Sequence, residues 1–232
     1  MSAGVSTRDG GVSGPPYDTL NLGRHVGDDP SSVEENRRRF CAALDADPAW
    51  LVTAGQVHGP TVQVVDAPRH EPFCDGLITT TPGLLLAVAT ADCAAVLLAD
   101  PAHGVAGACH AGWRGTAAGI VPHTIDTMTN LGAAPATLRA FVSPCISRNA
   151  FEVGPEVAAE FDEAVVHRRD EWPRPHVDLK AALRRQLRDA GLATDAIEIS
   201  GHCTVGDNET FFSYRAADGT TGRMFGAVVL RH

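Results

Sequence analysis

The chain of 232 residues lacks the sequence features of membrane-spanning, secreted and nucleic-acid-binding proteins. Its most apolar stretch, 84–98, is broken by Asp92 and is shorter than the about 18 residues of a membrane span, so we expect no transmembrane helix. The first residues, MSAGVSTRDGG, lack the basic and then apolar pattern of a secretion signal, which favours a cytoplasmic location. Lys and Arg number 19 against 28 Asp and Glu, and this net charge of −9 argues against a nucleic-acid partner.

Two short cysteine and histidine motifs are also absent. No CxxC occurs among the six cysteines, which excludes a zinc ribbon and a thioredoxin-type pair, and we expect free thiols. No HxH occurs among the ten histidines. The rest of the composition, 44% hydrophobic and 20% charged, is ordinary for a globular protein. We see no repeat or linker and therefore predict one domain over residues 1–232, with a monomer favoured.

The apolar pattern predicts strands that alternate with helices, which indicates a mixed sheet, or two packed sheets, with helices outside. The first helix is expected to start near Ser32, because Ser32 and Glu35 form a capping-box pattern. A second helix is expected over 116–131, kinked or begun at Pro122. Further helices are predicted at 155–166 and 178–190, and strands at 50–52, 61–65, 84–89, 94–99, 104–109, 138–142, 197–199, 211–214 and 224–230.

Three strand ends carry side chains that bind borderline metals. His58 lies in a predicted turn, Cys93 joins two buried strands, and His110 ends a third. One cysteine and two histidines suit zinc with an open fourth position. Their separations of 35 and 17 residues are not a local metal motif, so spacing alone favours a core cysteine and surface histidines. The remaining cysteines are expected to lie in the core or to have no functional role, and the remaining histidines, including His176 and His232, are expected on the surface.

The segment 112–115 is a tight glycine-containing turn that leads into a predicted helix. A helix start attracts anions through its free amide groups, and Arg114 at that point could hold a phosphate. A salt bridge from Arg114 to Asp92 or Asp75 explains its presence equally well. Trp113 is interpreted as a core residue rather than as a platform for a nucleobase.

Eight short segments occur in an order that is specific when they are taken together. They are STRDGGVS (6–13), LNLG (20–23), ENR (35–37), QVHG (56–59), DGLIT (75–79), ADC (91–93), HAGWRG (110–115) and FEVG (151–154). Over essentially the whole chain this pattern resembles the YfiH/laccase-domain family, also called the multicopper polyphenol oxidase or DUF152 family. Ser143 departs mildly from the glycine that commonly precedes Pro-Cys in that family.

The resemblance implies a single-domain α+β fold, an αββα-type sandwich of mixed β-sheets flanked by helices. It also implies that His58, Cys93 and His110 converge on one metal, usually zinc, with copper possible as an adventitious ion. The implied activity is phosphorolysis of purine nucleosides (adenosine, inosine, guanosine and methylthioadenosine) by inorganic phosphate, with adenosine deaminase side activity.

The same resemblance suggests roles for individual residues. Cys93, Asp92 and Arg114 are the expected catalytic residues, with Arg114 holding the phosphate. Asp92 or Asp75 would act as acid or base, or would orient a ligand histidine. The expected substrate contacts are Asn21, Arg37, Gln56, Asp75 and Arg114.

Three other functions remain open at this point. The laccase name implies copper-dependent phenol oxidation, but multicopper clusters use HxH pairs, which this chain lacks. Cys93 with a histidine could instead be the nucleophile and base of an amide hydrolase, and the resemblance implies peptidoglycan editing as its role, because some members of the family are described as peptidoglycan-editing factors. A non-catalytic metal-binding protein is the third alternative, and an open fourth ligand position argues against it.

Overall fold

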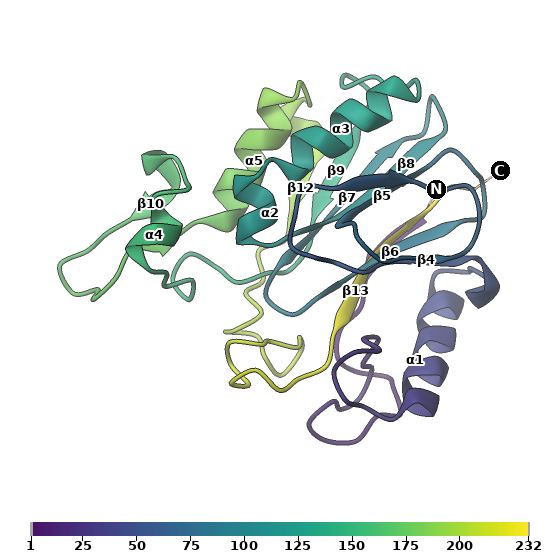
Figure 1. The fold of residues 1–232 in the computed structure, drawn as a ribbon, viewed down its shortest axis with the longest axis horizontal. Helices are drawn as coiled ribbons and strands as arrows, with labels where there is room; N and C mark the ends of the chain where they lie inside the picture. Colours follow the sequence, from purple (N-terminus) through teal and green to yellow (C-terminus); the bar gives the residue numbers. More distant parts are fainter. Residues whose placement is uncertain (1, 232) are drawn as a thin grey trace.

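Residues 2–231 are described by a computed structural model, in which two β-sheets pack face to face and helices cover both outer faces (Figure 1). The two sheets share one apolar layer and therefore form a single domain. The expected αββα-type sandwich is confirmed. The prediction for His232 lies outside the described residues. No helix within residues 2–231 is long and apolar enough to cross a membrane.

The first sheet packs against one helix, α1 (Pro30–Ala43). Phe40 and Cys41 of α1 contact an apolar surface that includes Leu85 and Phe225 of the sheet. The strand order is β1 (Ser2–Val5), β13 (Met224–Val229), β6 (Leu85–Thr90), β2 (Leu51–Ala54) and β4 (His70–Glu71). β2 runs parallel to β4 and β6, whereas β13 runs antiparallel to β1 and β6.

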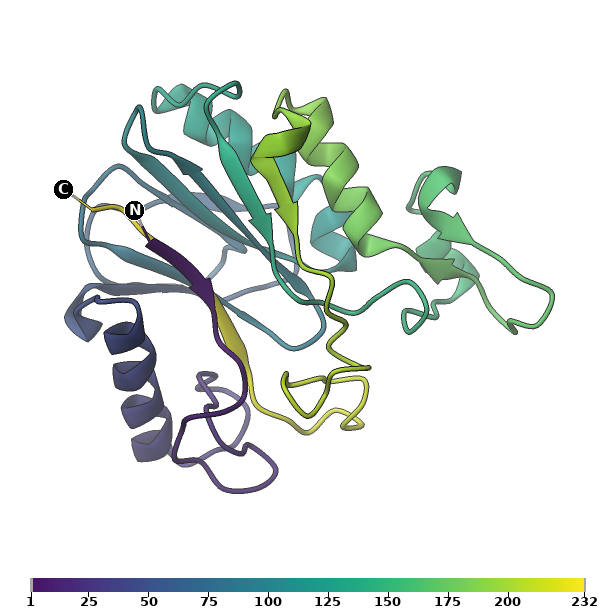
Figure 2. The ribbon, with the colours of Figure 1, turned by 180° about the vertical axis from the view of Figure 1, so that it is seen from behind.

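The second sheet is covered on its outer face by α2 (Trp113–Ala117), α3 (Ile120–Asn130) and α5 (Leu179–Asp189), as Figure 2 shows from behind. Its strand order is β12 (Ile197–Ile199), β9 (Arg139–Val142), β7 (Ala94–Asp100), β8 (Val105–Ala111), β5 (Gly76–Thr79) and β3 (Val62–Val64).

Side chains alternate between the two faces of each strand, and this alternation builds the core. In β7, Ala95 and Leu97 face the other sheet, while Val96 and Leu98 face the helices. β6 and β7 are consecutive in the sequence but belong to different sheets. The connection 91–93 therefore crosses from one sheet to the other and places Cys93 where both sheets end.

Several predicted elements are corrected by the structure. The N-cap of α1 is Asp29, whose carboxylate accepts from the amides of Ser31 and Ser32, so the helix starts before the predicted capping box. The expected helix over 116–131 is two helices, because Gly119 adopts φ of 82° between α2 and α3; Pro122 lies in the first turn of α3.

The region after residue 154 contains less helix than its pattern predicts. Helix α4 (Pro155–Ala158) is short and is followed by a 3-10 turn, Glu163–Val165. The hairpin of β10 (Val166–His167) and β11 (His176–Val177) then projects from the sandwich (Figure 1). The predicted strand at 211–214 is a loop, although Phe211 and Phe212 are buried as apolar side chains should be. A two-residue alternation cannot distinguish a strand from a loop that buries aromatic residues.

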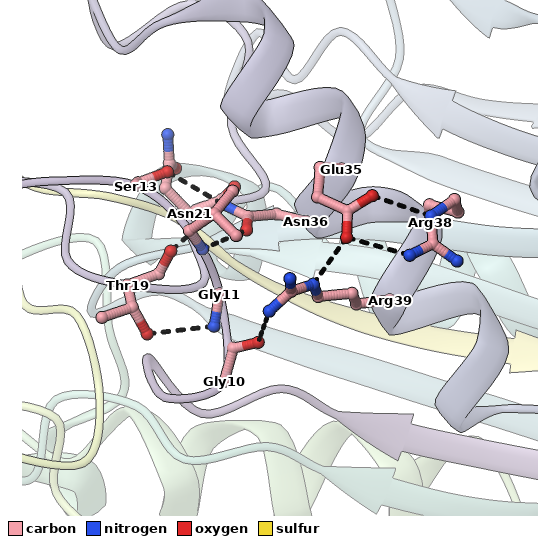
Figure 3. A network of polar contacts seen from close by, with 10 residues as sticks. Gly10, Gly11, Ser13, Thr19, Asn21, Glu35, Asn36, Arg38 and Arg39 are labelled. Atoms are coloured by element: carbon pink, nitrogen blue, oxygen red, sulfur yellow. Dashed lines mark hydrogen bonds and ion pairs between the residues drawn. The ribbon is translucent and has the colours of Figure 1, made fainter.

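The segment before α1 is held by a side chain from that helix. The amide of Asn36 donates to Ser13 Oγ and to the carbonyl oxygens of Thr19 and Asn21, and its oxygen accepts from the Val12 amide (Figure 3). Asn36 is fully buried, so water does not compete for these hydrogen bonds. They fix the irregular segment 10–23 against α1.

Candidate metal centre and active-site cavity

A cavity of about 740 Å³ extends over the ends of both sheets. One part lies beside α1, where Ala87, Ala89 and Phe225 on the outer face of the first sheet line it. The other part reaches His58, Cys93 and His110. This volume lies within the range of small-molecule sites, and the cavity is the natural place for chemistry in this fold.

His58, Cys93 and His110 come together in this cavity, as the family resemblance implies and spacing alone did not. Their ligand atoms all lie within 4.8 Å of one another, and the two imidazole rings are nearly perpendicular, with centroids 4.8 Å apart. Cys93 and His110 face the space between the sheets because they are in phase with Ala95 of β7 and Ala108 of β8. Cys109, which precedes His110 in β8, points to the opposite face of the second sheet and is buried under the helices.

Asp75 organises two of these three residues. Its Oδ1 atom accepts from His110 Nδ1 at 2.8 Å and from the His58 amide at 3.0 Å. Its Oδ2 atom accepts from the amides of Val57 and Gly59. These bonds stabilise the loop in which His58 adopts φ of 63°, a conformation that non-glycine residues rarely adopt. They also leave Nε2 of His110 free to face the other two ligands.

The ionisation of Asp75 suits this role. Burial would raise the pKa of its carboxyl group, but the hydrogen bonds from His110 and from the Gly59 and His58 amides outweigh burial and lower the pKa below its usual value. The group is therefore an ionised acceptor, and His110 Nδ1 carries the proton that it donates.

The donor set and the surrounding space fit one metal ion. Bonds of about 2.0–2.3 Å to a tetrahedral zinc place ligand atoms about 3.5 Å apart, so the three side chains need to approach by only about 1 Å. Gly112 makes room for them, because a Cβ atom there would lie 2.8 Å from Cys93 Sγ and 3.4 Å from His58 Cδ2. A thiolate and two imidazoles are ligands that zinc and copper both accept.

The thiol of Cys93 is prepared for ligation. Burial opposes its ionisation, but His110 and His58 outweigh burial and lower the pKa of Cys93 to about 6. In return Cys93 and Asp75 raise the pKa of His110 to about 9, against the effect of burial. Cys109 and Cys145 lack such partners, and burial raises the pKa of each to about 12. All six cysteines are free, as expected.

Asp92 lines the cavity but uses its carboxylate to hold a loop. The carboxylate accepts from the hydroxyl groups of Thr204 and Ser213 and from the Arg215 amide. These three residues belong to the long loop before β13. Asp92 therefore ties the 204–215 segment to the connection that carries Cys93.

The structure places the predicted substrate contacts in different surroundings. Gln56 lines the cavity, but its side-chain amide is already bonded to the backbone of Ala89. Its Nε2 atom donates to the Ala89 carbonyl oxygen, and its Oε1 atom accepts from the Ala89 amide. Asn21 is fully buried outside the cavity lining and bonds to Gly23, Asp28 and Arg223. Asp75 is buried behind the two histidines, where it positions them.

Arg114 does not lie where its sequence position suggests. Its side chain is exposed, stacks on Trp113 with its guanidinium carbon 4.3 Å from the ring centroid, and is not part of the cavity lining. Neither of the two expected salt bridges forms within residues 2–231. Arg114 is the second of the five residues of α2, whose buried side of Gly115 and Thr116 does not include it. Trp113 packs on the core, as expected, and also lines the cavity.

Other arginines line the cavity instead: Arg37, which was expected, and three that the sequence analysis missed, Arg24, Arg215 and Arg223. Arg223 immediately precedes the last predicted strand, so the strand-end rule that selected His58 and Cys93 would have selected it too. The same rule would have selected Arg215, which follows the predicted strand at 211–214, although the structure shows a loop there.

One histidine departs from its expected surface position. His176 in β11 is buried, and its ring stacks on Trp172 with centroids 3.9 Å apart. Its Nδ1 atom donates to the carbonyl oxygen of Arg148. The projecting hairpin shields this ring from solvent. The local sequence pattern does not predict this burial.

Fold and site together define a class: single-domain proteins with two packed sheets and a candidate His–Cys–His metal centre in an arginine-lined cavity. The chain belongs to the multi-copper polyphenol oxidoreductase laccase family, whose model matches residues 2–231. This confirms the resemblance in the sequence motifs.

Curated relatives and a solved structure cover nearly the whole chain. A protein of Mycobacterium tuberculosis named purine nucleoside phosphorylase is 44% identical over 94% of this chain and 88% of its own length. Purine nucleoside phosphorylase YfiH of Escherichia coli is 41% identical over 97% and 91%. The crystal structure of YlmD from Geobacillus stearothermophilus matches with a TM-score of 0.90 and 34% identity, over 99% of this chain and 92% of that one.

Proposed function

We propose that this chain is a zinc-dependent purine nucleoside phosphorylase that cleaves adenosine, inosine, guanosine and methylthioadenosine, with adenosine deaminase side activity. One observation carries the proposal. The His58–Cys93–His110 group lines an arginine-rich cavity in a chain that is 44% identical to a protein named for this reaction.

The three clustered side chains would hold one zinc ion. When bound, zinc would supply a Lewis acid at the cavity wall. Copper is the alternative ion for the same ligands. Three ligands provide for a single ion, whereas phenol oxidation of the laccase type needs a cluster, so we assign any copper-dependent oxidation to adventitious metal.

The other lining residues suit the two parts of a nucleoside reaction. In phosphorolysis a phosphate oxygen forms a bond to C1′ while the bond from C1′ to the purine nitrogen breaks, and the purine leaves with the electron pair and gains a proton. Arginines of the cavity would hold the phosphate. Apolar side chains that line the same cavity, Trp113, Phe151 and Leu179, would pack against the purine ring.

We assign positioning roles to the two carboxylates. Asp75 would hold His110 and the His58 loop in the geometry for the metal. Asp92 would hold the loop that carries Tyr214 and Arg215 at the cavity. Each carboxylate already accepts at least three hydrogen bonds, which favours positioning over proton transfer.

A second function, amide hydrolysis by Cys93, is favoured by one geometric observation. Asp75, His110 and Cys93 form a series in which the carboxylate holds one imidazole nitrogen and the thiol lies on the side of the other. This is the arrangement of an orienting residue, a base and a nucleophile. One thiolate cannot be both a resting metal ligand and a nucleophile, so the metal content decides between the two functions.

The test compares zinc-loaded and metal-free protein on inosine with phosphate and on adenosine without phosphate. We expect phosphate-dependent release of hypoxanthine, and ammonia from adenosine, only from the zinc-loaded form. Cys93→Ser should lose bound zinc and both activities together. Amide hydrolysis by the metal-free form, abolished by Cys93→Ser while no purine is released by either form, would replace our proposal with the hydrolase.

A further inference from the structure

The charge of the cavity is opposite to that of the protein. The chain carries a net charge of −9, yet the cavity is lined by four arginines and a single carboxylate, Asp92. Asp92 accepts from two hydroxyl groups and a backbone amide and forms no ion pair with these arginines within residues 2–231. A concave surface of one charge concentrates ligands of the other, so the cavity is built for an anion.

Two of the four arginines are already committed elsewhere. Arg24 is exposed and forms a 2.7 Å ion pair with Glu34. Arg215 is exposed and donates to the carbonyl oxygens of Ala150 and Glu152. The remaining pair, Arg37 and Arg223, is distinguished by burial, and neither forms an ion pair with a carboxylate within the described residues.

Arg37 is 7% exposed, and its Nε and Nη2 atoms both donate to the Leu22 carbonyl oxygen at 2.9 and 2.7 Å. The guanidinium lies over the Phe225 ring. Arg223 is half-buried; its Nη1 atom donates to two backbone carbonyl oxygens, and its guanidinium lies near the Tyr214 ring. Carbonyl oxygens fix both groups, and burial lowers the pKa of each.

The two arginines belong to one part of the cavity. The Leu22 carbonyl oxygen accepts from Arg37, while the Leu22 amide donates to the backbone of Arg223. Gly23, which follows Leu22 and also lines the cavity, lies close to Arg223, because a Cβ atom there would be 2.7 Å from Arg223 Cγ. Arg223 lines the same cavity as Cys93 and His110.

Both guanidinium groups keep free donors. Within the described residues, no protein acceptor is bound by Nη1 of Arg37 or by Nε and Nη2 of Arg223. Nε and Nη2 of one arginine form the fork that matches two oxygens of a phosphate. A buried cation without a counter-charge is costly, and a bound dianion would remove that cost.

We propose that Arg223, assisted by Arg37, holds the inorganic phosphate that serves as co-substrate. This assignment rests on the proposed phosphorylase function and replaces Arg114 as the phosphate-binding residue. Arg223 presents its free fork to two phosphate oxygens, and Arg37 adds one donor from the α1 side. The phosphate then lies between α1 and the metal ligands, with the purine on the side of Trp113.

The test measures phosphate binding to zinc-loaded protein by calorimetry without nucleoside, and the KM values for phosphate and for inosine. For Arg223→Gln we expect phosphate binding to weaken about 10- to 100-fold. The KM for phosphate should rise in parallel, while the KM for inosine changes less than about threefold. Arg223→Lys should recover part of the loss. Arg169→Gln is the matched control, because Arg169 stacks on Trp172 outside the cavity and should have no effect.

The outcomes separate the inference from the function on which it rests. Unchanged phosphate binding in folded Arg223→Gln overturns the inference, and so does an equal rise in both KM values. If wild-type protein binds phosphate through Arg223 but never forms ribose 1-phosphate, the phosphorylase proposal fails and the anion site stands. Tighter, more Arg223-dependent binding of AMP than of phosphate would overturn the assignment to inorganic phosphate. Arg37→Gln is added only if its melting curve shows a folded protein.

Discussion

Replacement of Asp75 by asparagine tests how the candidate metal ligands are held. The carboxylate accepts four hydrogen bonds, from His110 Nδ1 and from the amides of Val57, His58 and Gly59. Asparagine keeps one oxygen, so two of the four donors lose their acceptor and face an NH2 group instead. A donor left without a partner costs about 1–3 kcal/mol when it is buried, and the three amides are only partly buried, so we expect a loss of about 2–4 kcal/mol in unfolding free energy.

The effect on metal binding is separate from this loss of stability. A missing hydrogen bond to a ligand histidine weakens metal binding about 10- to 100-fold, so Asp75→Asn should bind zinc more weakly by that factor in competition with a chromophoric chelator. The matched control is Asp100→Asn, because Asp100 is also fully buried and accepts from Ala134, Thr137 and His103 at the far end of β7. The control should lose similar stability and keep wild-type zinc affinity. Equal zinc affinity in wild type and in folded Asp75→Asn would refute the reasoning.

Two further predictions concern the space beside Cys93 and the acid stability of the fold. Gly112→Ala should weaken zinc binding about tenfold or more with little change in melting temperature, because its Cβ would lie 2.8 Å from Cys93 Sγ; wild-type affinity measured by the same competition would contradict this. The pKa of Asp100 is about 2 although burial opposes ionisation, because Ala134, Thr137 and His103 donate to the carboxylate. Its stabilisation is therefore complete above the unfolded pKa of 3.8 and is lost as the pH falls toward 2. In urea unfolding, the difference in unfolding free energy between wild type and Asp100→Asn should decrease by about 2 kcal/mol between pH 5 and pH 2. A difference that stays constant over this pH range would exclude this role for Asp100.

The two-sheet core was largely predictable because alternation of apolar residues marks buried strands. The runs 84–89 and 94–99 appear as β6 and β7, within a residue at either end. Their assignment to different sheets was not predictable, since two adjacent apolar runs separated by a short turn look like a hairpin. The helix expected over 155–166 is wrong because the chain buries Ala158 and Val165 with a short α4 and a separate 3-10 turn, so buried apolar positions at this spacing do not require one continuous helix.

The candidate metal ligands could be chosen from the sequence because each lies at the end of a buried strand. The arginine that we propose for phosphate could not be chosen in this way, since Arg114 and Arg223 both lie close to predicted elements and only the tertiary structure shows which side chain lines the cavity. The role of Asn21 was likewise invisible. Its buried side chain joins Asp28 to the backbone of Arg223, and these contacts between distant segments leave no local pattern.

Phosphorus NMR of zinc-loaded protein with inosine and inorganic phosphate tests the central claim most directly. The account predicts a ribose 1-phosphate signal that grows at the expense of phosphate, in equal amount to the hypoxanthine released. Hypoxanthine with free ribose and an unchanged phosphate signal, or no release of hypoxanthine at high protein concentration, would contradict it.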